Sequence, residues 1–234
     1  MEEFLQKNRR VYHFLLRWGI FMIGLWIFSL GLALTIKAEL GVAPWDVLHI
    51  GLWLNFGWTI GTWSIIVSFL IVGIASLISR SWPKAGTVLN MIFIGIFIDL
   101  ALMIPWLQTP ETFLGKFAML LAGIVINGYG IGLYIAPRCG AGPRDSLMLA
   151  LTERTGWKVQ WTRITIEATV LVIGWLLGGP VFIGTICFVL GTGTMVGFTL
   201  PQCQKVVDRL LGGIEIEDLN KGKIRLNHHD GISQ

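Results

Sequence analysis

Six long apolar stretches run through this chain of 234 residues and limit what it can fold into. They lie near residues 18–36, 60–79, 86–104, 116–136, 160–178 and 182–200. A helix needs about 20 apolar residues to cross the hydrocarbon core of a bilayer. The stretches therefore predict an all-α membrane protein with six transmembrane helices.

Two further apolar segments, 44–54 and 143–154, are too short to cross a bilayer, so we expect re-entrant or interfacial helices there. Hydrophobic residues make up 54% of the chain and charged residues 14%, more apolar than a water-soluble core of this size requires. The net charge of +4 does not indicate nucleic-acid binding, because no folded basic domain lies outside the predicted spans.

The positions of Lys and Arg indicate how the chain is oriented, since cytoplasmic loops are enriched in them. If the N-terminus is cytoplasmic, every one of the 18 basic residues except Lys37 and Lys116 falls on the cytoplasmic side. Counting either short helix as a span would break this pattern. We therefore expect a basic cytoplasmic N-terminus over 1–17 and a weakly ordered, polar cytoplasmic tail over 201–234.

The chain contains an internal repeat. A shift of 99 residues places 24–58 over 123–157, and twelve of these 35 pairs are identical. At a shift of 98, Gly86-Thr87 and Gly95 meet Gly184-Thr185 and Gly193. The halves 18–106 and 116–200 each read as span, short helix, span, span, and an odd number of spans inverts the second copy. Such inverted repeats are typical of secondary transporters, whose broken or short helices meet at the site.

Both short helices begin with the same element, Gly-x-x-Pro-x-Asp, at Gly41–Asp46 and Gly140–Asp145. One explanation is structural: Pro suits the first helical position, Asp complements the helix dipole, and Gly57 and Gly156 end the helices. The other is functional, because a helix N-terminus that faces a cavity binds polar ligands. Arg144 would attract an anion and the aspartates would repel it, so a cation, a proton or a zwitterion fits equally well.

Ionisable residues inside membrane spans mark a pathway or a partner. Asp99 lies in the third span, and Arg163 precedes Glu167 by four residues in the fifth, where the two can neutralise each other. Asn90 and Asn127 suit hydrogen bonds between helices. Asp46 and His49, spaced i and i+3, suit a proton relay, and no third ligand supports a metal site. The candidate solute-binding residues are Asp46, His49, Asn90, Asp99, Arg144, Asp145, Arg163 and Glu167.

The sequence contains no motif that predicts catalysis. No Ser or Cys lies beside a His as a nucleophile, and no HExxH occurs. The stretch Gly191-Thr192-Gly193-Thr194 lacks the Lys of a phosphate-binding loop and predicts close helix packing instead. We expect no enzyme, catalytic residue, metal or cofactor; lipid head-group chemistry is the one enzymatic class that a membrane protein of this kind would suit.

Five motifs resemble the bacterial YczE/YyaS/YitT membrane-protein family, in particular its YczE-like branch. They are GVAPWDVLH at 41–49, GTVLN at 86–90, CGAGPRD at 139–145, RTGW at 154–157 and GGPVFIGT at 178–185. The resemblance covers about residues 18–200. It implies a multi-pass protein of the bacterial plasma (inner) membrane and implies no particular activity.

The leading hypothesis is a small transporter-like carrier of a polar or amphipathic solute. The alternative is a membrane scaffold that binds another protein through its cytoplasmic loop and tail. The lipid bilayer is the expected environment of both. Glycines at 24, 31, 123 and 130 offer close-packing surfaces, either between two copies in a homodimer or within one chain.

Overall fold

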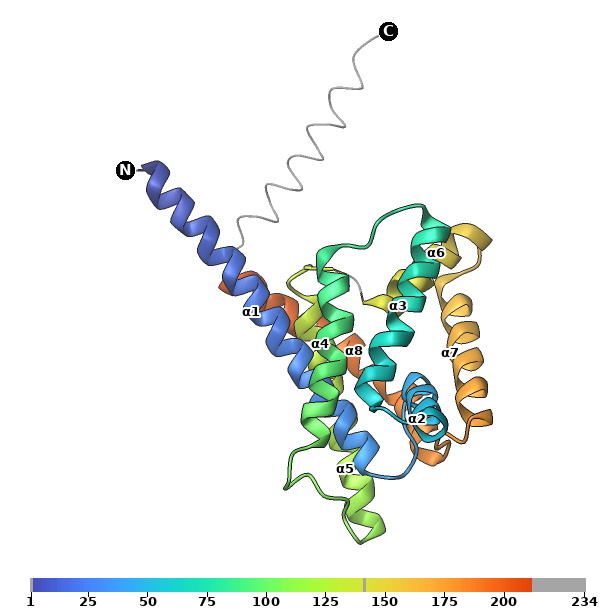
Figure 1. The fold of residues 1–234 in the computed structure, drawn as a ribbon. Coiled ribbons are helices and arrows are strands. Elements are labelled where there is room, and N and C mark those ends of the chain that lie inside the picture. The colour runs from blue at the N-terminus through green and yellow to red at the C-terminus, as the bar shows by residue number, and fades with distance from the viewer. Residues whose placement is uncertain (1, 141, 212–234) are drawn as a thin grey trace.

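The computed structural model describes residues 2–140 and 142–211, and these form eight helices with no strand among them (Figure 1). The helices are α1 (Glu2–Lys37), α2 (Pro44–Phe56), α3 (Ile60–Ser79), α4 (Ala85–Leu102), α5 (Phe113–Ile135), α6 (Pro143–Thr155), α7 (Val159–Leu176) and α8 (Ile183–Leu210). The prediction of an all-α membrane protein is confirmed in its fold class.

Five helices of the described chain are long and apolar enough to cross a membrane: α1 from Val11 onward, α3, α4, α5 and α8. The sixth predicted stretch is also helical, as the 18 residues of α7. It falls outside this set because Gln160, Arg163 and Glu167 make its first half polar.

The two short helices lie where the repeated element predicts them. Each begins at its proline, and the glycines after them, Gly57 and Gly156, adopt φ of 73° and 70°, which stops the helix. In α2, the residues from Pro44 to Gly51 are all buried, whereas those from Trp53 onward are exposed. In Figure 1, α2 and α6 lie at opposite ends of α3 and α7.

Both predicted polar ends are helical where the structure describes them. The helix α1 begins at Glu2, and its apolar segment of span length begins at Val11. The helix α8 continues through Pro201 to Leu210, so residues 201–210 of the predicted tail are helical, whereas weak order was expected. Cys203 and Val207 are buried against Ala136, and this apolar contact holds the extension of the helix. The rest of the predicted tail, 212–234, lies outside the described residues.

The helices α1 and α5, which are equivalent in the repeat, cross at close range. Each of the four glycines predicted to offer packing surfaces is buried at this crossing, where an added Cβ would collide with the other helix. The close pairs are Gly24 with Leu133, Gly123 with Leu34, Gly31 with Asn127, and Gly130 with Phe28. The 99-residue shift converts each pair into another of the set. These glycines therefore pack within one chain, in the reciprocal way that a two-fold relation between two units produces.

A second set of contacts is reciprocal in the same way. The start of α8 lies on the loop before α2, and the start of α4 lies on the loop before α6: Gly184 approaches Leu40 and Gly41, and Gly86 approaches Cys139 and Gly140. The backbone N–H of Gly184 also donates a hydrogen bond of 2.6 Å to the carbonyl of Leu40. Each short helix is thus positioned by the last long helix of the other half.

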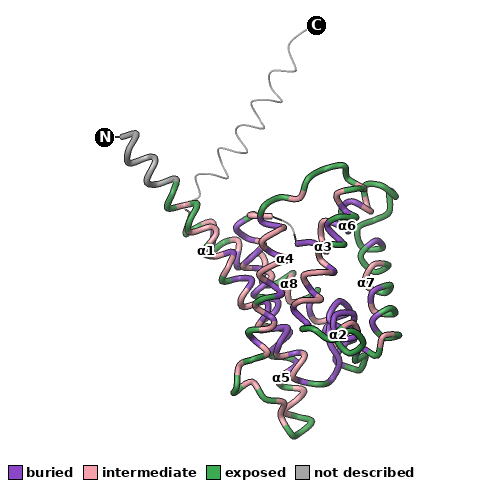
Figure 2. The backbone as a smooth tube through the Cα atoms, viewed as in Figure 1, coloured by how far each residue is buried: buried purple, intermediate pink, exposed green. Residues whose placement is uncertain are grey.

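The contact between the last two long helices differs between the two halves; we call this contact the α3–α4 seam in the first half and the α7–α8 seam in the second. The helices α3 and α4 pack against each other where α3 begins and α4 ends, with Gly61 against the backbone of Gly95. Their counterparts α7 and α8 make little contact with each other, and Gly193, which matches Gly95, has no neighbouring atom within 4 Å. The prediction of close packing for Gly191–Thr194 is therefore wrong at Gly193. Figure 2 shows α7 as a largely exposed helix, in which Thr162, Val170 and Gly174 are the buried residues.

Candidate functional site

The N-termini of the two short helices line one cavity of about 250 Å³. The first helix contributes Ala43, Pro44 and Trp45, and the second contributes Gly142 to Asp145. Neither helix has a side-chain hydrogen bond at its N-cap, so the N–H groups of its first turn are not capped by a side chain. Both copies of the repeated element therefore meet at the same cavity.

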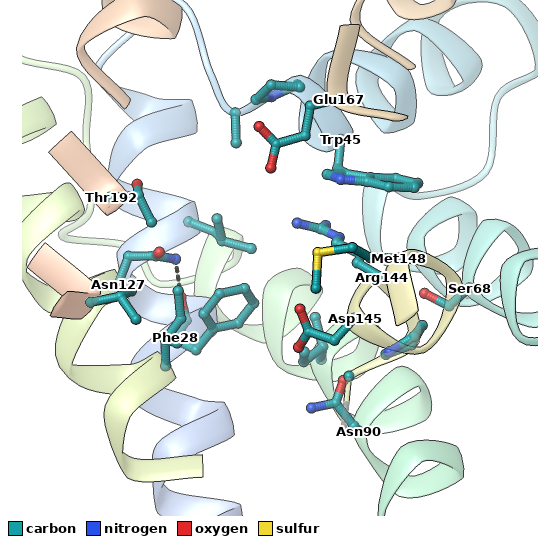
Figure 3. A pocket seen from close by; sticks show the side chains of 18 of the residues that line it. Phe28, Trp45, Ser68, Asn90, Asn127, Arg144, Asp145, Met148, Glu167 and Thr192 are labelled. Atoms are coloured by element: carbon teal, nitrogen blue, oxygen red, sulfur yellow. Dashed lines mark hydrogen bonds between the residues drawn. The ribbon is translucent and has the colours of Figure 1, made fainter. Parts of the chain in front are cut away.

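Four buried polar side chains on long helices line this cavity. They are Ser64 of α3, Asn90 of α4, Asn127 of α5 and Thr192 of α8. Both polar atoms of Asn90, Oδ1 of Asn127 and Oγ1 of Thr192 find no hydrogen-bond partner in the protein. A buried polar group left unpaired costs about 1–3 kcal/mol, so these atoms suit a polar ligand. Figure 3 shows Asn127 and Thr192 on one side of the cavity and Asn90 on the other.

Two basic and two acidic side chains line the same cavity: Arg144, Arg163, Asp145 and Glu167. Within α7, Nε of Arg163 donates a hydrogen bond of 2.8 Å to Oε1 of Glu167. The guanidinium of Arg144 lies 5.0 Å from the centre of the Trp45 ring, within the range of a cation–π interaction. The two cations and two anions leave the cavity wall electrically balanced.

Two contacts at the cavity join residues at matched positions of the repeat. Arg144 corresponds to Trp45 at the 99-residue shift, and the two stack on each other. Asn127 corresponds to Phe28, and Nδ2 of Asn127 donates a hydrogen bond of 3.5 Å to the carbonyl of Phe28. Residues that touch their own counterparts lie near the axis relating two units. At this axis one half presents aromatic side chains and the other polar ones, so the cavity wall is asymmetric.

The structure brings together five of the eight candidate residues. Asn90, Arg144, Asp145, Arg163 and Glu167 all line the cavity. Figure 3 labels all of them except Arg163. The pairing of Arg163 with Glu167 inside one helix agrees with the simpler explanation of their spacing, and both residues still face the cavity.

The other three candidate residues do not line the cavity. Asp46 and His49 are buried beside each other in α2, with 3.5 Å between Oδ1 of Asp46 and Nδ1 of His49, and neither of these atoms makes a hydrogen bond. Asp99 lies at the α3–α4 seam, where its carboxylate accepts hydrogen bonds from the N–H of Gly61 at 2.8 Å and the hydroxyl of Thr59 at 2.6 Å. The Asp99 carboxylate therefore joins the end of α4 to the start of α3.

Several lining residues were not among the sequence candidates. Trp45 and Tyr134 are aromatic, and Ser64, Ser68 and Thr192 carry hydroxyls that are ordinary within membrane helices. A signal existed for Trp45, because it replaces Arg144 in the repeated element. Among the described residues, no three His, Cys, Asp or Glu side chains come together as metal ligands.

Comparisons with known proteins agree with the sequence resemblance. Residues 15–201 match a family model described as a family of unknown function, DUF6198. The chain is 47% identical over 188 residues to the "Uncharacterized membrane protein YczE" of Bacillus subtilis (strain 168), covering 80% of this chain and 86% of that protein. It is 34% identical to an "Uncharacterized protein" of Haemophilus influenzae (78% of this chain, 82% of that protein) and 28% identical to the "Uncharacterized protein YyaS" of Bacillus subtilis (78% and 92%). No solved structure matches this chain.

Proposed function

This chain belongs to the DUF6198 family of YczE-like membrane proteins, and from that premise we propose that it is a carrier of a small polar or amphipathic solute across the bacterial plasma membrane. The observation that carries the proposal is the cavity of about 250 Å³ at which both short helices begin. A bundle that served only as a scaffold would gain nothing from buried, unpaired amides around such a space. The proposal includes no catalytic step.

The proposed topology has six spans, with α7 as the fifth and both termini in the cytoplasm. Two observations support an inverted repeat: the reciprocal contacts of the four glycines between α1 and α5, and the distribution of basic residues along the chain. In α7 the polar Arg163 and Glu167 line the cavity and pair with each other, which would lower the cost of placing this less hydrophobic helix in the bilayer.

The balanced charges of the cavity favour a solute without net charge. A ligand with a net charge would be bound with an uncompensated charge at low dielectric, which is unfavourable. A neutral or zwitterionic solute leaves the balance intact, and its polar groups can pair with Asn90, Asn127 and Thr192. In the proton-coupled form of the proposal, Glu167 is the carboxylate that takes up and releases the proton.

The test is uptake into proteoliposomes of radiolabelled neutral and zwitterionic solutes, including amino acids, betaines and glycerophosphocholine. We expect Asp145→Asn to lower initial uptake at least tenfold. Glu153→Gln, an exposed change on the same helix, should leave uptake unchanged. Glu167→Gln should remove the dependence on an imposed pH gradient. Uptake no faster than in protein-free liposomes for every solute would overturn the proposal.

A deletion distinguishes the carrier from the scaffold alternative. Removing residues 212–234 leaves α8 and its buried Val207 in place. A carrier should keep its uptake after this deletion, and a protein that acts through its tail should lose a bound partner.

A further inference from the structure

The closed α3–α4 seam depends on three residues, and all three have counterparts at the α7–α8 seam. A Cβ at Gly61 would collide with the carbonyl of Gly95, so two glycines allow the closest approach, and Asp99 joins the end of α4 to the start of α3. At the repeat shifts, the counterparts of Gly61, Gly95 and Asp99 are Gln160, Gly193 and Gly197. The second seam therefore lacks one of its two contact glycines and the joining carboxylate.

The cavity reaches the protein surface where this second seam fails to close. Arg163 of α7 and Val189 and Gly193 of α8 line the cavity and are also exposed. An added Cβ at Gly193 would meet no atom within 4 Å. Both helices also carry exposed apolar side chains beside the opening, with Ile164 and Leu190 exposed by 48% and 69%. In a bilayer such faces contact lipid, so the opening leads from the cavity into the hydrocarbon region.

The rim of the opening is mixed in chemistry. Apolar side chains form most of it, Ile166 of α7 and Val189 and Val196 of α8, and the ion pair of Arg163 with Glu167 lies on its α7 side. The space behind it presents Arg144 and Asp145 from one helix, together with the unpaired polar atoms of Asn127 and Thr192. Ligand pockets usually start at about 300 Å³, so a cavity of about 250 Å³ suits a head group and leaves an alkyl chain outside.

We propose that the α7–α8 seam is a lateral portal through which a single-chain zwitterionic amphiphile enters the cavity from the bilayer. Its cationic group lies toward Asp145 and its anionic group toward Arg144, and its alkyl chain lies between Ile166 and Val189. The inference concerns how the amphiphile enters and binds. Whether the bound amphiphile is then transported rests on the proposed function.

The experiment uses the full chain in nanodiscs with a lysophosphatidylcholine that carries a photoreactive diazirine in its acyl chain. After illumination, peptide mass spectrometry should find adducts on α7 and α8 at the portal rim. Gly193→Trp adds an indole at a position where an added Cβ meets no atom within 4 Å, and it should lower these adducts at least tenfold. Gly73→Trp is the matched control, because Gly73 is exposed, has no atom within 4 Å and does not line the cavity. It should label like the native chain.

Three results would overturn the portal. The first is equal labelling of the Gly193→Trp and native chains, and the second is labelling spread evenly over all lipid-facing helices. The third is a crosslink between two copies from benzoylphenylalanine at position 189, because a second copy would then occupy the seam.

Uptake of water-soluble glycerophosphocholine separates this inference from the proposed function. If Gly193→Trp abolishes lipid labelling and the native chain still takes up no solute, the portal stands and the carrier function fails. If solute uptake is normal and the portal residues are never labelled, the carrier function stands and the portal fails.

Discussion

The α3–α4 and α7–α8 seams occupy equivalent places in the two halves, yet one is closed and the other is open. In the first, Gly61 and Gly95 bring the backbones into contact and Asp99 accepts hydrogen bonds from the start of α3. In the second, Gly193 has no neighbour and lines the cavity. The comparison teaches that a few side chains in a repeat decide whether two helices meet, and so where a cavity opens.

The largest effect should come from one substitution placed at both seams. Gly95→Leu puts a side chain against the carbonyl of Gly61 and the side chain of Ile65, and overpacking of this kind costs up to about 3 kcal/mol. Gly193→Leu meets open space and should stay within about 0.5 kcal/mol of the native chain. Unfolding of both variants in detergent, followed by circular dichroism, measures the difference. Equal destabilisation would show that the two seams are packed alike.

A smaller loss should follow from removing the carboxylate of the closed seam. Asp99→Ala deletes the acceptor for the N–H of Gly61 and the hydroxyl of Thr59, and hydrogen bonds to a charged group contribute about 1.5–3 kcal/mol. Gly197→Ala, at the matched position of the open seam, should be neutral or slightly stabilising because Ala favours a helix. The same unfolding measurement applies. A stable Asp99→Ala chain would remove the carboxylate from the explanation of the closed seam.

The ion pair beside the open seam should matter little for stability. Arg163 and Glu167 are four residues apart in one helix, with side chains 55% and 24% exposed, and pairs of this kind contribute about 0.3–0.5 kcal/mol. We expect Arg163→Gln to lower the free energy of unfolding by no more than this. Because both residues face the cavity, its effect on solute uptake should be much larger. If Arg163→Gln lowers the free energy of unfolding by clearly more than this amount, the pair supports the fold and the loss of uptake has a structural cause.

The smallest effect lies outside both seams, in the exposed pair of Glu39 and Lys116. Nζ of Lys116 lies 2.7 Å from Oε2 of Glu39, and this hydrogen bond holds the pKa of the Glu39 carboxyl below its ordinary value of 4.5. A carboxyl with a lowered pKa stabilises the folded state above pH 4.5, and this contribution disappears as the pH falls through the folded-state pKa. Lys116→Met should therefore be slightly less stable than the native chain at pH 7 and equal to it at pH 3. A difference that persists at pH 3 would point to another cause.

Much of the fold could be predicted because hydrophobic length and helix-end residues act locally. Proline and glycine placed both short helices within two residues of their observed ends, since each restricts the backbone wherever it occurs. Two features were harder to predict because tertiary contacts compensate for unfavourable local sequence. The polar residues in the N-terminal half of α7 line a cavity, and the continuation of α8 past Pro201 packs against Ala136.

The candidate site was predicted in part, for a related reason. Arg144 and Asp145 follow directly from the repeated element, and both line the cavity. Asp46 belongs to the same element but does not line the cavity, and Asp99 binds the backbone of Gly61. A rule that counts every ionisable residue in a membrane helix identifies residues that need a partner. It does not identify which partner, because this depends on the face that the helix presents after packing.

The sequence by itself determined that this is an α-helical membrane protein and that residues 24–58 match residues 123–157, since length, hydrophobicity and repeat spacing need no tertiary contact to be read. Only the tertiary structure decided that both short helices begin at one cavity and that Gly193, unlike Gly95, faces open space. The physical reason is that helix formation depends on neighbours along the chain, whereas a cavity depends on which side chains meet across helices far apart in sequence.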